Sequence, residues 1–419
     1  MKICLLSYRG NPYCGGQGVY LYYLAKALAD RGHQVTAMVG PPYPLPMPWA
    51  RLIKIANLNF INRAGRAAIP SDHPLSALAP GNLAELVLSR IGSNPEMLSF
   101  SLRAFQALRQ MLEQGERIDL VHDNQSLGYG LLLIQRLGIP VVATIHHPLQ
   151  VDRKEDLRQM PEFFRRFRRA LYYPLWMQKL VARRVNRLVT VSDISRDLIA
   201  RTYRIPAEKI ETVPNGVDLE IFRPNPAVAK VPGRVLFVGS SEDRKKGILY
   251  LLRALKRIND PAVRLTIVDG RLRPERVYAK NLAQELGLGP RVAFLEKISR
   301  DQLILEYNKA EVVVMPSLFE GFGLPALEAM ATGTALIASR AGALPEVVGE
   351  EGGVLFEPGN DRELAEKIIQ LLDDAGLRKK LGELGRKRAE QGFGWERVGQ
   401  RLETIYQEEL GKKEERAWR

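Results

Sequence analysis

The chain has only two cysteines, Cys4 and Cys14, among its 419 residues. Two thiols are too few for a disulfide framework, and their spacing fits no zinc motif, so they indicate a reducing compartment. The sequence also lacks any run of about 18 apolar residues that could span a bilayer, and its opening apolar run is too short for a signal peptide. We therefore expect a protein that is cytoplasmic or peripheral at the inner face of the membrane.

No composition bias marks the chain as disordered or fibrous. Hydrophobic residues make up 46% of the sequence and charged residues 26%, which is typical of a soluble globular enzyme. At roughly 150 residues per domain, the length predicts two or three domains.

Positive charge exceeds negative charge mainly in the first half of the chain. Residues 1–225 hold 29 Lys+Arg against 18 Asp+Glu, and residues 151–190 hold 11 against four. Aromatic residues and arginines interleave at 163–176 (FFRRFRRALYYPLW), as they do in interfacial membrane helices. Membrane contact through 158–187 and a solvated face over a packed aromatic stripe explain this pattern equally well, and nucleic acid is the less favoured partner.

A short apolar run followed by a helical pattern recurs along the chain, first at 2–7 before 19–31. Strands so short and so apolar belong to parallel sheets that are covered on both faces. Nine further segments are predicted as strands in the same way: 34–39, 120–122, 141–145, 187–191, 235–239, 264–268, 292–295, 312–315 and 335–338.

The segment 222–233 contains three prolines and no periodicity, so we predict a linker there. It would separate a doubly wound domain at 1–221 from a second one at 234–395, and a helix at about 396–419 would pack back on the first. Such folds bind ligands at the carboxyl ends of their strands, so we expect the site in a cleft between the two domains.

A glycine-rich turn, YCGGQGV at 13–19, follows the first predicted strand. Missing Cβ atoms around Gly16 would let backbone N–H groups approach a phosphate or sugar at a helix N-terminus. The spacing is not that of a dinucleotide fingerprint, and a tight strand-to-helix turn explains it as well.

A richer motif, PSLFEGFGLPALE, occupies 316–328. Gly321 and Gly323 would free backbone N–H groups for an anion, while the helix predicted to begin near Pro325 turns its positive end to the same place. Carboxylates beside an anion are costly unless they bind hydroxyls, so Glu320 and Glu328 indicate a sugar or a ribose.

The two glutamates, seven residues apart, resemble the E-x7-E motif of retaining glycosyltransferases with the GT-B fold, specifically family 4, which includes phosphatidylinositol mannosyltransferases and sucrose synthases. The resemblance covers nearly the whole chain and has several independent matches in the right order: 15–35, 191–192, 213–218, 237–239, 246–247 and 341–347.

The resemblance implies roles for single residues. Glu328 is similar to the glutamate that binds the nucleotide ribose, and Glu320 to the one that touches the transferred sugar. Phe322, Gly323 and Leu324 would offer backbone N–H groups to the sugar and the distal phosphate.

Lys246 is similar to the lysine that the family keeps against the diphosphate, which agrees with the need for a cation beside a leaving pyrophosphate. The family commonly has an arginine where this chain has Ser240. The second phosphate cation would then be Arg244 or Lys245, or be absent, and we favour Arg244.

His146 follows the predicted strand 141–145 at the carboxyl edge of the sheet. A lone histidine there is more often a loop or core residue. The family, however, places a histidine after a Thr-hydrophobic pair on the acceptor side of the donor sugar. Sequence leaves His147 open as the alternative.

We therefore predict retaining transfer of a hexose from a UDP- or GDP-linked sugar to an acceptor hydroxyl, on a lipid or another anionic acceptor. No cofactor or metal is expected, because the chain has no Asp-x-Asp of the kind that holds a divalent ion. The rival interpretations are an epimerase or phosphorolytic enzyme of the same fold and a non-catalytic sugar-nucleotide-binding protein.

Overall fold

The computed structural model forms two compact units. The first unit comprises Met1–Val191, Ser195–Val213 and Val398–Arg419, and the second comprises Ser192–Ile194 and Pro214–Arg397. The structure describes residues 1–11, 16–57, 82, 85, 87, 90, 94–151, 153, 174–269, 278–296 and 298–417.

The chain enters the second unit at Pro214, earlier than the linker predicted at 222–233. The predicted linker itself packs within the second unit. Phe222 is buried, and the Val231 N–H donates to the Lys309 carbonyl at 2.8 Å.

A seven-stranded parallel sheet forms the centre of the first unit, in the order β3-β2-β1-β4-β5-β6-β7. The chain builds outward from β1 to β3 and then returns to β4 on the other side of β1, so the strand order reverses between β1 and β4. The strands are β1 (Lys2–Ser7), β2 (Gln34–Val39), β3 (Arg51–Lys54), β4 (Leu120–Asn124), β5 (Val141–Ile145), β6 (Arg187–Thr190) and β7 (Ile210–Thr212).

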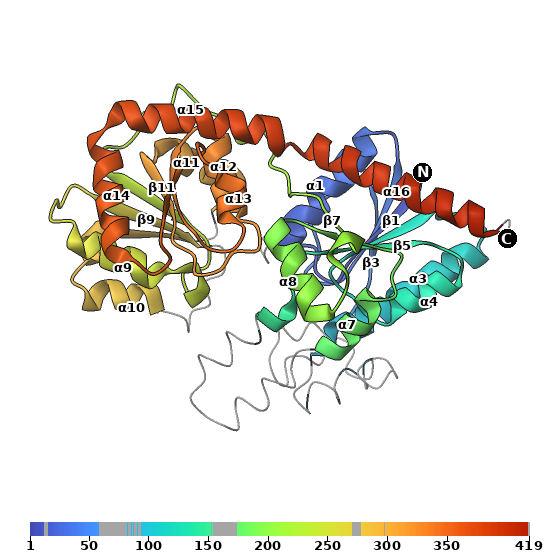
Figure 1. Cartoon of the computed structure of the whole chain (residues 1–419). Coiled ribbons are helices and arrows are strands. Elements are labelled where there is room, and N and C mark those ends of the chain that lie inside the picture. Colours follow the sequence, from blue (N-terminus) through green and yellow to red (C-terminus); the bar gives the residue numbers. More distant parts are fainter. Residues whose placement is uncertain are drawn as a thin grey trace. The chain divides into compact units, whose positions relative to one another are not determined.

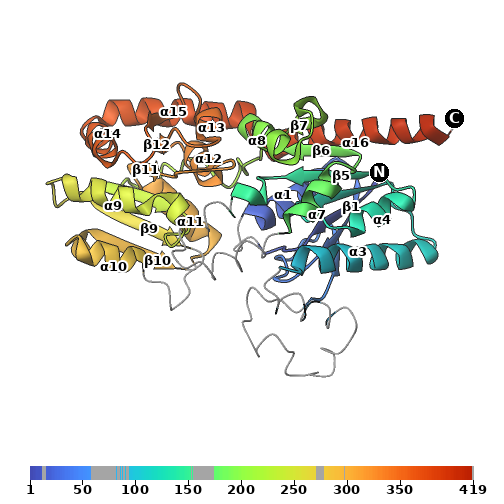
Figure 2. The same ribbon diagram turned by 60° about the horizontal axis from the view of Figure 1, so that its bottom comes forward.

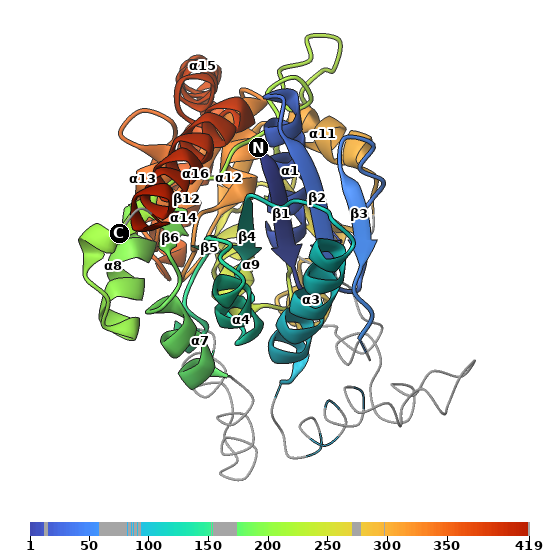
Figure 3. The same cartoon turned by 90° about the vertical axis from the view of Figure 1, so that its right-hand side faces the viewer.

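Helices cover both faces of this sheet (Figure 3). One face packs against α3 (Glu96–Glu113), α4 (Gly130–Arg136), α7 (Leu175–Ala182) and α8 (Asp193–Tyr203) in a single apolar core. The other face packs against α1 (Gly16–Asp30) and α16 (Trp395–Ala417). On α16, Leu402, Ile405 and Tyr406 are fully buried, and the Tyr406 hydroxyl bonds to His122 of β4.

The second unit has a six-stranded parallel sheet in the order β10-β9-β8-β11-β12-β13. Here the order reverses between β8 and β11. The strands are β8 (Arg234–Val238), β9 (Arg264–Asp269), β10 (Val292–Glu296), β11 (Val312–Met315), β12 (Ala335–Ser339) and β13 (Val354–Phe356).

Two helical layers enclose the second sheet, as Figures 1 and 2 show. On one face α9 (Ile248–Arg257), α10 (Tyr278–Glu285) and α14 (Asp361–Asp373) share an apolar core with the strands. On the other lie α11 (Arg300–Lys309), α12 (Leu324–Ala331), α13 (Leu344–Val348) and α15 (Ala375–Gly392).

The prediction of two doubly wound parallel α/β sheets is confirmed. All ten predicted strands are present. Sequence analysis missed β3, β7 and β13, which have three or four residues each and all lie at sheet edges. The segments β3 (RLIK) and β7 (IET) contain charged or polar residues, and β13 (VLF) is only three residues long, so none of the three has the apolar run on which the prediction depends.

Among the described residues, no helix combines the length and the apolar character needed to cross a membrane. The aromatic and arginine-rich stretch predicted to contact a membrane lies mostly outside the described residues.

Candidate active site

In each unit, polar loops follow the two central strands at the point where strand order reverses. In open α/β sheets this is where ligands bind. In the second unit these loops follow β8 and β11, and they contain Lys246 and Glu320.

Lys246 and Glu320 form an ion pair in which Nζ donates to Oε2 at 2.6 Å. Both side chains keep some exposure, 27% and 13%. The Lys246 loop is held against the Glu320 loop by the Leu318 N–H, which donates to the Lys245 carbonyl at 2.7 Å. Gly247 allows this approach, since it has φ 72° and a Cβ there would lie 1.8 Å from the Pro316 carbonyl oxygen.

The Glu320 backbone is fixed from the other side by the loop that follows β12. Its carbonyl accepts from the Ala343 N–H at 2.9 Å. Gly342 has φ 55°, and a Cβ at this position would lie 2.1 Å from the same carbonyl oxygen. The backbone that carries Glu320 is therefore defined by close packing that only glycine permits.

The N-terminus of α12 lies directly after Glu320. Gly323 precedes the helix with φ 102°, and Pro325 is in its first turn. Within the described part of the chain, the N–H groups of Phe322, Gly323 and Leu324 donate to no other group. Unpaired N–H groups at the positive end of a helix form an anion-binding site.

Glu328 lies on α12 and is partly exposed. Its Oε2 accepts a hydrogen bond from the Tyr307 hydroxyl at 2.7 Å. Burial raises the pKa of Glu328 to about 7, although the tyrosine hydrogen bond and the charge of Arg300 act in the opposite direction. This carboxyl therefore changes charge near neutral pH.

The two candidates for the second phosphate cation have different surroundings. Arg244 is exposed and lies over the Tyr278 ring, with Cζ 5.2 Å from the ring centroid. Lys245 Nζ lies 3.9 Å from Asp243 Oδ2. The structure brings Lys246 to Glu320 and leaves the choice between Arg244 and Lys245 a prediction.

In the first unit, His146 is held at the carboxyl end of β5 by β4. Its Nε2 lies 2.8 Å from Asn124 Oδ1. The amide of Asn124 donates in turn to the Gln17 carbonyl at 2.9 Å, so its oxygen faces His146 and the imidazole carries its proton on Nε2. Tyr20 of α1 packs edge-on against the imidazole at 4.8 Å between ring centroids.

Burial lowers the pKa of His146 to about 3, with a further contribution from the neighbouring His147. The imidazole is therefore neutral at physiological pH, and its Nδ1 remains a hydrogen-bond acceptor. A second neutral histidine, His122, lies behind it, and burial lowers its pKa to about 3 as well.

Sequence analysis did not single out Asn124, Gln125 or Tyr307. The Gln125 side chain accepts from the His146 N–H at 2.7 Å and donates to the His147 carbonyl at 2.9 Å. Gln125 also has φ 59°, a sparsely populated conformation that is common at functional sites. Only their position could have indicated them: Asn124 ends β4, the strand next to β1 at the reversal point, and Gln125 follows it.

Gly16 begins α1 and is exposed, but residues 12–15 of the glycine-rich turn lie outside the described part. The predicted donor contact of Gly16 stays a prediction.

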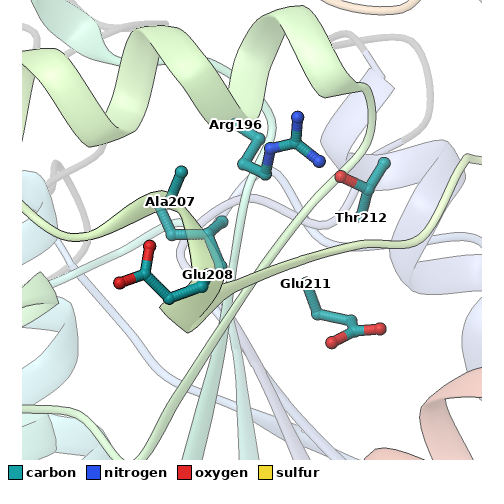
Figure 4. Close-up of a pocket in the computed structure, with 6 residues that line it drawn as sticks. Arg196, Ala207, Glu208, Glu211 and Thr212 are labelled. Atoms are coloured by element: carbon teal, nitrogen blue, oxygen red, sulfur yellow. The ribbon is translucent and has the colours of Figure 1, made fainter.

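A cavity of about 320 Å³ lies elsewhere in the first unit (Figure 4). No predicted site residue lines it. Its walls come from α8, β7 and the turn before β7: Arg196, Ala207, Glu208, Ile210, Glu211 and Thr212.

Two protein families match most of the chain. Residues 14–221 match Glycosyltransferase Family 4, and residues 220–388 match Glycosyl transferases group 1. The MMP alpha-(1->4)-mannosyltransferase of Mycolicibacterium hassiacum is 38% identical over 416 residues, covering 98% of this chain and 99% of the relative. The D-inositol 3-phosphate glycosyltransferase of Streptomyces bingchenggensis is 28% identical, covering 98% and 90%.

Solved structures agree on the fold. Sucrose-phosphate synthase from Thermosynechococcus elongatus has a TM-score of 0.75 and 26% identity, covering 98% of this chain and 100% of that one. Anabaena HepE in complex with UDP has a TM-score of 0.70 and 22% identity, covering 97% and 100%. The chain therefore belongs to the family 4 glycosyltransferases, and its two parallel α/β units are those of the GT-B fold.

Proposed function

We propose that this glycosyltransferase moves a hexose from a UDP- or GDP-linked sugar to an acceptor hydroxyl with retention at the anomeric carbon. The observation that carries the proposal is the Lys246–Glu320 pair beside the unpaired N–H groups of α12, with Glu328 on the same helix. Mannose is the favoured hexose, because the Mycolicibacterium relative is named as an α-mannosyltransferase. An α product from an α-linked donor is the outcome that retention gives.

In the proposed reaction, the bond between the anomeric carbon and the β-phosphate oxygen breaks while the acceptor oxygen bonds to the same face of that carbon. The acceptor proton leaves with the departing phosphate. Negative charge then grows on the β-phosphate, where Lys246, the amides of Phe322 to Leu324 and the positive end of α12 stabilise it. Because these groups supply the positive charge, the proposal includes no metal ion.

Glu328 would accept hydrogen bonds from the ribose, and Glu320 from a hydroxyl of the transferred sugar. Lys246 Nζ donates to Glu320 Oε2 at 2.6 Å. A lysine placed between a carboxylate and a phosphate connects recognition of the sugar with stabilisation of the leaving group.

His146 would act on the acceptor side as a neutral hydrogen-bonding group. Its Nε2 proton is committed to Asn124, so Nδ1 is the atom available to accept a hydrogen bond from a sugar hydroxyl. Gln125 holds the backbone of this histidine in place.

An anionic acceptor, on a lipid or as a phosphorylated small molecule, agrees with the basic surplus of residues 1–225. Relatives named for D-inositol 3-phosphate support this class of acceptor.

The proposal is tested by incubating the protein with GDP-mannose, UDP-glucose and UDP-galactose in EDTA, with and without mannose oligosaccharides and inositol phosphates. We expect nucleoside diphosphate release that depends on the acceptor, and an α-linked product by NMR. Donor epimerised without acceptor, a β-linked product, or binding without turnover would each contradict it.

A further inference from the structure

We propose that Tyr307 is a positioning residue for nucleotide recognition: its hydroxyl holds one carboxylate oxygen of Glu328 so that the other is presented to the ribose diol. The inference rests on the proposed function, since it assumes that Glu328 binds the ribose.

The tyrosine is anchored at several points. It is fully buried on α11, and its ring packs against Phe222 with the centroids 6.1 Å apart. Its carbonyl accepts from the Thr334 hydroxyl at 2.9 Å. These contacts fix the side chain so that its hydroxyl is directed toward α12.

On α12 the phenol hydroxyl lies near two acceptors, Glu328 Oε2 at 2.7 Å and the Pro325 carbonyl at 3.3 Å. The first distance is that of a strong hydrogen bond to a charged group and the second is marginal. Among the described residues, Glu328 Oε1 accepts no hydrogen bond. Tyr307 thus occupies one oxygen and leaves the other for a ligand.

The same contact controls the charge of the carboxyl. Burial favours protonated Glu328, whereas the hydroxyl of Tyr307 and the charge of Arg300 favour the ionised form, which is the better acceptor for ribose hydroxyls. Removing the hydroxyl removes one of the groups that lower the pKa of Glu328, so the pKa rises and the carboxyl stays protonated to higher pH. Nucleotide binding by the variant should then require a higher pH than binding by the wild type.

The test compares ribonucleotide and dideoxynucleotide affinity on the same protein preparation. Calorimetry would give the Kd of GDP and UDP and of their 2′,3′-dideoxy forms, from pH 6 to 9, for wild type, Tyr307→Phe, Glu328→Gln and the double variant. Tyr203→Phe is the matched control, because Tyr203 is equally buried and its hydroxyl bonds to Gln178 in the first unit.

Tyr307→Phe should weaken ribonucleotide binding about tenfold near neutral pH, because the Glu328 carboxyl is then less often ionised and its oxygens are less firmly oriented. It should leave dideoxynucleotide binding unchanged and move the pH midpoint of ribonucleotide binding upward. The double variant should bind ribonucleotide no more weakly than Glu328→Gln does. Tyr203→Phe should have the wild-type affinities for both nucleotide forms. The ratio of the ribonucleotide Kd to the dideoxynucleotide Kd is measured on one preparation of each protein, so it does not depend on the fraction of that preparation that is folded.

Equal weakening of both nucleotide forms, or an unchanged pH midpoint, would overturn the role of Tyr307. A failure of the proposed function gives a different result, since Glu328→Gln would then keep the wild-type preference for the ribonucleotide.

Discussion

Single residues of the candidate site are defined by neighbours far away in sequence. Lys246 and Glu320 are 74 positions apart, yet they form a direct ion pair. His146 owes its tautomer to Asn124, which is fixed by Gln17 in turn. The chemistry of each group therefore depends on contacts that no local motif contains.

At Lys246, replacement by alanine should lower kcat by at least tenfold, because each 1.36 kcal/mol of lost transition-state stabilisation changes the rate about tenfold. Steady-state kinetics with saturating donor measures the effect. Lys280→Ala is the control, since Lys280 pairs with Glu296 at 2.7 Å as Lys246 does with Glu320 but is not among the predicted site residues. Equal loss in both variants would show that Lys246 has no special role.

Arg244 and Lys245 can be separated in the same assay. Arg244→Ala should lower kcat, whereas Lys245→Ala should change it less, if Arg244 replaces the arginine that the family usually has at position 240. The reverse order would identify Lys245 as the second phosphate cation.

At the scale of elements, glycines determine how closely neighbouring loops approach. Gly247 brings the loop before α9 against the end of β11, and Gly342 brings the loop after β12 against Glu320. Gly247 is the N-cap of α9, and Gly342 lies just before α13, but helical periodicity does not show that a neighbouring loop approaches either glycine. The requirement becomes visible only when the two loops are seen in contact.

Gly342→Ala should therefore destabilise the protein and lower turnover together. A left-handed backbone costs alanine about 1 kcal/mol, and the contact with the Glu320 carbonyl adds to that cost. Gly287→Ala is the matched control, since Gly287 has φ 73° in the same unit and no atom within 4 Å of a built Cβ. In the Gly287→Ala control, the unfolding temperature should fall only modestly, and kcat should not change. Matching losses in the two variants would mean that the Glu320 contact is not limiting.

At the scale of the whole molecule, buried polar groups connect distant parts of the chain within one unit. His122 on β4 bonds to Tyr406 of α16 and, at 2.8 Å, to Thr144 of β5. Tyr20 of α1 completes the network through Thr144 at 3.0 Å. A polar network without solvent is stable only while each member keeps its partner and its charge state.

Stability should consequently fall in mild acid. The pKa of His122 is about 3 in the fold and about 6.5 when unfolded, so between these values the unfolded chain binds a proton that the folded chain does not. The free energy of unfolding should then decrease by about 1.4 kcal/mol per pH unit below pH 6.5 from this group. Urea unfolding of wild type and His122→Gln measures it. An identical slope in the two proteins would show that His122 has the same pKa in the folded and unfolded chains.

Membrane association is a prediction from sequence alone. Replacing Arg165, Arg166, Arg168 and Arg169 by Gln should weaken binding to anionic liposomes and leave donor affinity unchanged, because each basic residue near such a surface contributes about 1 kcal/mol. Sedimentation at low and high salt measures it. No pelleting of wild type, or equal pelleting of the variant, would favour the solvated-face interpretation.

The architecture of this protein could be predicted from its amino-acid order, because most of its central strands are short apolar runs that alternate with helices. Burial on both faces of a parallel sheet leaves this pattern in the amino-acid order. The glutamates 320 and 328 were also accessible to sequence, since both lie within one strand-to-helix turn and its helix.

Which groups act together depends on tertiary contacts. Tyr307 lies 21 residues before Glu328 on another helix, Gln125 reaches the His146 backbone from a neighbouring strand, and the short edge strands depend on pairing rather than on their own residues. These relations arise when helices and strands that are distant in sequence pack together. Local propensity and spacing therefore contain no record of them.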